Sequence, residues 1–204
     1  YGRPARGTQD SVAAITRDDL VGMHQSLMQR AGLKVAVVGA IDATKLASLL
    51  DDVFQALPAQ MPLSKIQRIT MQGLGTRKVI DVDVPQSTIR FGLPGIDLHD
   101  PDHIPAMVLN HILGGGVFSA RLFKEVREKR GLAYSVHSSL VSFRHTASFM
   151  GGTSTKNERA AESLSVIEEE IRKLASDGPS ADELEKAKKY LIGSYDLRFD
   201  TSTK

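Results

Sequence analysis

Residues 113–134 read LGGGVFSARLFKEVREKRGLAY, and the prediction of the fold starts from this stretch. Three consecutive glycines do not continue a helix, so a helix that arrives from the N-terminal side is expected to break here. A second helix follows from Ser119, with Leu122, Phe123 and Val126 on its inward face. Gly131 ends that helix, and a strand follows from Leu132. The stretch therefore predicts a helix, a break, a second helix and a strand in immediate succession.

Segments with the pattern of strands lie on both sides of this stretch. Residues 33–41 are an almost unbroken apolar run, which suits a strand covered on both faces. Two further segments alternate apolar and polar residues, as half-buried strands do, and a pair of strands turns near residues 143–145. The expected strands are residues 33–41, 80–84, 89–93, 132–141 and 146–153.

Helices are predicted from N-terminal caps that precede apolar residues at helical spacing. Thr16 and Asp42 cap the first two, and a helix that begins near Asp100 leads into the glycines. Two helices close the chain, each with the pattern of a capping box: Thr155 with Glu158, and Ser180 with Glu183. Strands followed by runs of helices, joined by short hairpins, indicate an α+β fold.

The composition narrows the class of protein. With 204 residues, 41% of them apolar, the chain fits one large domain, or one domain with an appended piece. A formal net charge of only +2 and the lack of any run of about 18 apolar residues speak against a nucleic-acid partner or a membrane span. The chain has no cysteine, which excludes disulfides and thiolate chemistry and leaves the compartment, bacterial periplasm or cytoplasm, undecided. Since it begins at Tyr1 without a leader, we expect a fragment cut at both ends.

No metal or cofactor site is predicted within the chain. None of the six histidines stands in a His-Glu-x-x-His motif. His99 and His103 are four residues apart, but Pro101 between them marks a helix start, so loop and cap positions are the favoured interpretation. The glycine triplet would suit an anion only with the other features of a phosphate loop, and a hinge between two helices is favoured instead.

Arg127 and Tyr134 are the candidate site residues, at the junction of the second helix and the strand. A guanidinium and a phenol held together can donate hydrogen bonds to a substrate carbonyl, or to the oxyanion that forms from it. The residues alone favour a plainer interpretation, in which Arg127 forms a surface salt bridge and Tyr134 is a half-buried strand residue. Their spacing does not decide between the two.

The same stretch resembles the signature of the C-terminal domain of M16 metallopeptidases, the family of insulinase, pitrilysin and the mitochondrial processing peptidases. The shared pattern is Leu-Gly-Gly-Gly, Ser-x-Arg-Leu-Phe and Val-Arg-Glu-Lys-Arg-Gly-Leu-Ala-Tyr-Ser. The likeness covers essentially the whole chain. It implies a linker from a missing N-terminal domain over residues 1–16 and the C-terminal domain, truncated at its end, over residues 17–204. The implied fold is a two-layer α+β sandwich of a mixed, mostly antiparallel sheet with helices on one face, as in LuxS and the processing peptidases.

The resemblance also implies a function. In this family the zinc motif belongs to the N-terminal half, and the C-terminal half supplies an Arg and a Tyr with six residues between them, here Arg127 and Tyr134. Their implied role is to bind the substrate carbonyl and stabilise the tetrahedral intermediate, opposite a zinc-activated water. The implied partners are a peptide substrate and a zinc-bearing half, in the same chain or in a partner subunit of a dimer. The fragment alone is expected to be inactive.

The sequence differs from the family pattern in two ways, and these differences bear on which function the chain has. The zinc motif is missing, so a non-catalytic scaffold or partner subunit with the same fold is the rival hypothesis, and a peptide-binding module is a third. The glycine-rich loop of the processing-peptidase α subunit is longer than residues 114–116, which favours a bacterial-type peptidase.

Overall fold

The computed structural model describes residues 2–61 and 66–198. The chain divides into two compact units, Tyr1–Ile66 and Gln67–Lys204.

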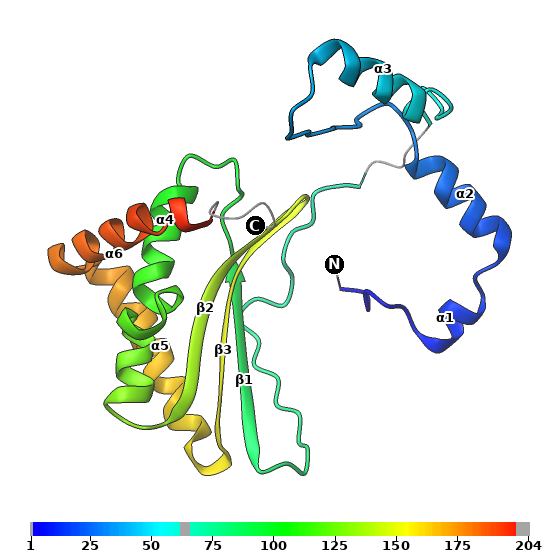
Figure 1. The fold of residues 1–204 in the computed structure, drawn as a ribbon. Helices are drawn as coiled ribbons and strands as arrows, with labels where there is room; N and C mark the ends of the chain where they lie inside the picture. The colour runs from blue at the N-terminus through cyan, green and yellow to red at the C-terminus, as the bar shows by residue number, and fades with distance from the viewer. Residues whose placement is uncertain (1, 62–65, 199–204) are drawn as a thin grey trace. The chain divides into compact units, whose positions relative to one another are not determined.

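The described part of the first unit contains the helices α1 (Gln9–Ala13), α2 (Arg17–Leu27) and α3 (Ala43–Phe54) (Figure 1). The predicted caps are confirmed. The hydroxyl of Thr16 accepts a hydrogen bond from the Asp19 amide at 3.2 Å, and the Asp42 carboxylate accepts one from the Lys45 amide at 2.9 Å. Each bond satisfies an amide that the first helical turn leaves without a partner.

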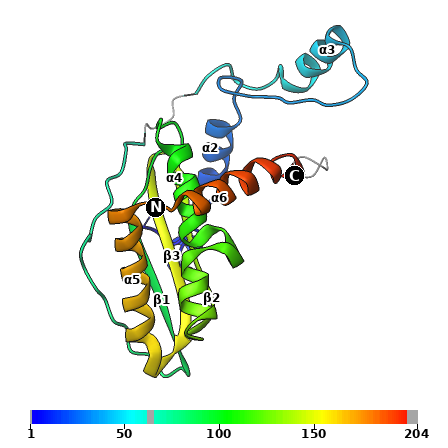
Figure 2. The same ribbon diagram turned by 90° about the vertical axis from the view of Figure 1, so that its left-hand side faces the viewer.

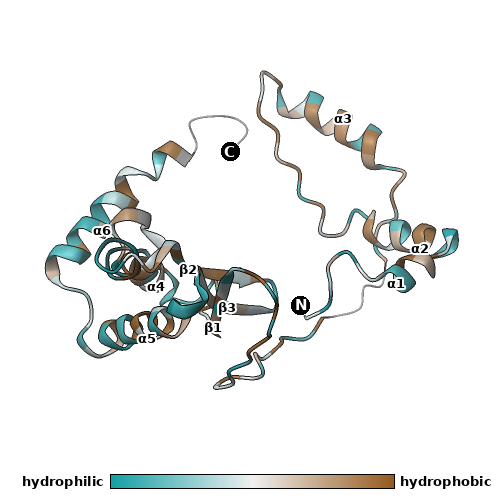
Figure 3. Ribbon diagram, turned by 90° about the horizontal axis from the view of Figure 1, so that it is seen from below, coloured by the Kyte–Doolittle hydropathy of each residue, from teal (hydrophilic) through white to brown (hydrophobic). Residues whose placement is uncertain are grey.

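The predicted strand over residues 33–41 is not formed. In the described part of this unit, residues 2–61 and 66, no segment pairs as a strand. Val35 and Val37 are almost half exposed and Val38 is fully exposed, and Figure 3 shows further apolar residues along α3. A strand is held by hydrogen bonds to a neighbouring strand, so an apolar run without a partner stays extended and unpaired.

The second unit is built on an antiparallel sheet of β1 (Gln86–Pro94), β2 (Ala133–Phe143) and β3 (Thr146–Lys156), in the order β1-β3-β2. Three predicted strands are thereby confirmed. The predicted strand over residues 80–84 is wrong: these residues join no ladder, although the carbonyl of Val84 accepts a hydrogen bond from the Asn157 side chain at 2.9 Å. Alternation of apolar and polar residues indicates that one side of a segment is exposed, but it does not show that the segment pairs with a neighbouring strand.

Helices cover one face of this sheet, as Figures 1 and 2 show. The α+β fold with helices on one face is therefore confirmed. In the described part of this unit, residues 67–198, there are three α-helices and several shorter π- and 3₁₀-helical turns. The α-helices are α4 (His103–Asn110), α5 (Ala160–Asp177) and α6 (Ala181–Gly193). The turns are η1 (His111–Gly115), η2 (Val117–Ser119), η3 (Phe123–Glu128), η4 (Asn157–Arg159) and η5 (Asp196–Arg198).

One of the two predicted capping boxes is present. Ser180 and Glu183 form it at the start of α6. The other is wrong, because Thr155 is buried inside β3 and its hydroxyl donates to the Leu132 carbonyl at 2.6 Å. Helix α5 begins only after the turn η4. The Thr155 hydroxyl therefore binds the backbone just before β2, and it does not cap a helix.

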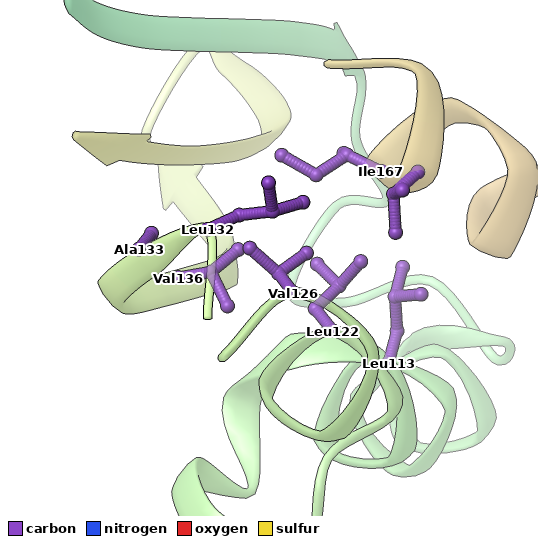
Figure 4. Packing of buried hydrophobic residues seen from close by; sticks show 8 residues of the cluster. Leu113, Leu122, Val126, Leu132, Ala133, Val136 and Ile167 are labelled. Carbon is purple, nitrogen blue, oxygen red and sulfur yellow. The ribbon is translucent and has the colours of Figure 1, made fainter. Parts of the chain in front are cut away.

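The core of the second unit is formed largely by residues 113–134. Figure 4 shows Leu122 and Val126 of the helical segment packed with Leu132, which directly precedes β2, with Val136 of β2 and with Ile167 of α5. Leu122 and Val126 have no exposed surface. Burial of a side chain of this size stabilises the fold by about 1.5–3 kcal/mol. The helix that carries Arg127 is thus anchored to the strand that carries Tyr134.

The glycine triplet is required by close packing. A Cβ atom on Gly114 would lie 2.5 Å from the hydroxyl oxygen of Ser138, and one on Gly115 would lie 2.7 Å from the side-chain nitrogen of Asn110. The amide of Gly116 donates to the His111 carbonyl at 2.9 Å and so does not face an anion. The triplet lets the helical segment approach β2 at backbone distance.

Candidate functional site

The turn at Gly131 brings the two candidate residues together. Gly131 has φ of +58°, and its amide donates to the Arg127 carbonyl at 2.9 Å. The next amide, of Leu132, donates to the Val126 carbonyl at 2.8 Å. These bonds end the helix, and the left-handed residue turns the chain back into β2. Tyr134, near the start of β2, therefore returns to the side of Arg127.

Arg127 lies between two aromatic rings. Its guanidinium carbon is 4.7 Å from the centre of the Phe123 ring and 4.7 Å from the centre of the Tyr134 ring. Phe123 is buried, whereas Tyr134 is 82% exposed. Contacts of a guanidinium with ring faces contribute about 0.5–2 kcal/mol each and fix the plane of the group. The stack holds Arg127 in place without using its N–H groups.

The other arginines of this segment are neutralised by acids. Arg121 binds Glu183 with two hydrogen bonds of 2.7 and 2.8 Å, and Arg130 binds Glu125 at 2.6 Å. Arg127 has no ion pair within the described ranges 2–61 and 66–198. Among the described residues Arg127 therefore forms no salt bridge, and its donors are left for a ligand.

A β-bulge exposes Tyr134. Ala133 is paired with Thr155 and Val136 with Thr153, so Tyr134 and Ser135 together stand opposite Ser154 alone. Without the extra residue, Tyr134 would lie on the same face as the buried Val136. Bulges often redirect side chains beside functional sites. Tyr134 is accordingly exposed, which corrects the interpretation of a half-buried strand residue.

A hollow of about 380 Å³ opens beside the stack. Arg127 and Tyr134 line it together with Phe118 and Phe123, whose rings meet edge to face at 5.1 Å. The site thus offers hydrogen-bond donors next to an apolar surface. This combination suits a peptide carbonyl with an adjoining side chain.

Phe118 and Phe123 also belong to the site, although the sequence does not predict a functional role for either of them. Phe123 was expected only as an inward-facing helix residue, and it is indeed buried. The available signal was its spacing from Arg127, since side chains four residues apart on a helix are neighbours. Nothing in the sequence pattern indicated Phe118.

The described residues do not form a site for a zinc ion. Among residues 2–61 and 66–198, no group of three or more His, Asp or Glu side chains could hold a metal. His99 lies in a loop and His103 is the first residue of α4, as expected for loop and cap positions.

None of the described helices combines the length and the apolar character that crossing a membrane requires.

Comparison with known proteins identifies the family. The model of the peptidase M16 inactive domain matches residues 14–191. The chain belongs to this family. A crystal structure of a peptidase M16 inactive domain from Pseudomonas fluorescens has the same fold, with a TM-score of 0.84 and 30% identity, over 95% of this chain and 47% of that one.

Relatives of this M16 domain carry different descriptions. An uncharacterized zinc protease of Streptomyces coelicolor is 34% identical over 95% of this chain and 43% of its own length. A protein of Helicobacter pylori named a non-peptidase homolog is 29% identical over 97% of this chain and 45% of its own length. The chain spans somewhat less than half the length of these relatives. The relatives of this domain thus include a protein named a zinc protease and a protein named a non-peptidase homolog.

Proposed function

We propose that this M16 domain is the substrate-binding half of a zinc-dependent peptidase. Arg127 and Tyr134 donate hydrogen bonds to the carbonyl of the peptide bond to be cleaved, and to the oxyanion that develops from it. The observation that carries the proposal is the stack, which leaves the Arg127 N–H groups without an ion pair in the described chain beside an exposed phenol. We place the domain at residues 17–204 and a link to a preceding domain at residues 1–16.

The zinc belongs to another half in this proposal, because the described residues contain no ligand set for it. That half lies in the same chain or in a partner subunit, and the two halves enclose the peptide. This chain contributes binding, orientation and charge stabilisation, and it is inactive alone. The compartment we propose is the periplasm or cytoplasm of a bacterium, since the relatives named above are bacterial.

A non-catalytic scaffold or partner subunit is the second candidate, and the relative named a non-peptidase homolog favours it. A scaffold has no use for an unpaired arginine stacked on an exposed tyrosine. These two features support the peptidase over the scaffold.

Replacement of Tyr134 tests the proposal in the complete enzyme, with both halves present. Tyr134→Phe keeps the ring on Arg127 and removes the hydroxyl, so kcat should fall by about ten- to a thousandfold, the effect of losing one oxyanion donor. The measurement is steady-state hydrolysis of a fluorogenic peptide.

Tyr190→Phe is the matched control, because Tyr190 is also exposed, its ring stacks on His111 at 4.9 Å, and it does not line the hollow beside Arg127. Its kcat should stay near that of the wild type. An unchanged rate for Tyr134→Phe in an active enzyme would refute the role of the phenol.

A further inference from the structure

A second hollow adjoins the first. It has a volume of about 260 Å³ and shares Tyr134 and Ser135 with the hollow beside Arg127. Its other walls are mostly polar, and they include Ser154, Lys156 and Arg159. A peptide that passes Tyr134 therefore meets two neighbouring hollows of different chemistry, one with aromatic walls and one with basic side chains.

The bulge in β2 accounts for the position of this hollow. Thr153 and Thr155 of β3 are buried, whereas Ser154 and Lys156 are exposed on the opposite face of the strand. Ser154 stands opposite the bulged pair Tyr134 and Ser135, and Lys156 lies two residues further along β3. The extra residue in β2 thus leaves Tyr134 and Lys156 around the same opening.

Lys156 supplies an unneutralised positive charge. Arg159 binds Glu162 at 2.7 Å, so its charge is compensated. Lys156 has no ion pair with any residue in the described ranges. No carboxylate is among the residues that line the hollow. The hollow therefore favours an anionic group on the ligand.

We propose that this hollow is a subsite for a carboxylate of the bound peptide, with Lys156 as its counterion. The inference rests on the proposed function, since the peptide is placed by its carbonyl on Arg127 and Tyr134. Successive side chains of an extended peptide point in opposite directions at about 3.3 Å per residue, so two neighbouring hollows can receive different residues. The carboxylate comes from an acidic side chain or from the C-terminus of the peptide.

Peptide binding to the complete protein tests the subsite independently of hydrolysis. The probes are a labelled neutral peptide, variants with Asn or Asp at each position in turn, and forms with a free or an amidated C-terminus. Fluorescence anisotropy measures Kd for each. We expect one site of charge, either one Asp position or the free C-terminus, to bind about three- to fivefold more tightly than its neutral counterpart, as for a partly exposed ion pair.

Substitutions of Lys156 test whether this residue causes the preference for a charged peptide. Lys156→Gln should abolish the preference, and Lys156→Glu should reverse it. Lys188→Gln removes the same charge from an exposed position of α6 and should leave the preference unchanged. The Asp position and the free terminus distinguish the two sources of the carboxylate.

The outcomes separate the subsite from the proposed function. Absence of any preference, or a preference that persists in Lys156→Gln, would overturn the subsite, while a rate loss in Tyr134→Phe would still support the peptidase. Binding that depends on Lys156 in a complete protein without hydrolytic activity would support the subsite and overturn the peptidase.

Discussion

Arg127 is held by its shape as well as its charge. A guanidinium is flat, so it can lie between the rings of Phe123 and Tyr134 while its edge donates hydrogen bonds. A lysine ammonium at the same position would keep the positive charge but lose the planar contact and the fork of donors. At position 127 arginine and lysine are therefore not equivalent, whereas in a surface salt bridge one could replace the other with little effect.

Arg127→Lys is accordingly expected to lower kcat/KM of the complete enzyme by about ten- to a hundredfold, through loss of the stack and of a donor. Arg130→Lys is the matched control, three residues along the chain, where a lysine can still pair with Glu125. Peptide hydrolysis and the unfolding midpoint would be measured for both. Near wild-type activity in Arg127→Lys would mean that charge alone suffices and that the stack has no role.

Among the elements, the start of the helical segment is tied to α6 by Arg121 and Glu183. Their side chains are only 18% and 26% exposed, and Arg121 also donates to the Gly178 carbonyl at 3.1 Å. The hydrogen bonds from Arg121, together with those from Ser180, lower the pKa of Glu183 from 4.5 to about 2. The folded state thus binds the proton of Glu183 more weakly than the unfolded chain does. The stability this provides is complete above pH 4.5 and is lost as the pH falls towards 2.

Glu183→Gln should therefore destabilise the complete protein by about 2–3 kcal/mol near pH 7, with the difference from wild type shrinking between pH 4.5 and 2. The glutamine can still serve in the capping box, so the charge is the main loss. Asp182→Asn is the control, because its pair with Lys186 is about 70% exposed and solvent screening should leave it only a small contribution to stability. Thermal unfolding at several pH values measures both. A pH-independent difference would contradict the assignment to Glu183 ionisation.

At the same scale, the elements show which structural features can be predicted from sequence. The helical spacing of apolar residues correctly predicted that Leu122 and Val126 are buried. The predicted helix caps at Thr16, Asp42 and Ser180 are also correct, because helix spacing and caps depend on contacts between residues close in sequence. The predictions of strands at residues 33–41 and 80–84 are wrong, because a strand needs a neighbouring strand to pair with and the hydropathy pattern of a segment does not identify that neighbour. The approach of Arg127 to Tyr134 depends on the Gly131 turn and the β2 bulge, which spacing alone did not reveal.

For the whole molecule, the proposal predicts where the metal lies. Since the described residues hold no ligand set, the complete enzyme should contain about one zinc per pair of M16 halves, bound outside residues 2–61 and 66–198. Tyr134→Phe and Arg127→Lys should then lower the rate while leaving the zinc content unchanged. Metal analysis of purified wild-type and variant proteins, alongside peptide hydrolysis, makes the measurement. Loss of zinc in either variant would place the metal near these residues, and a complete protein without zinc or a zinc-bearing partner would favour the scaffold.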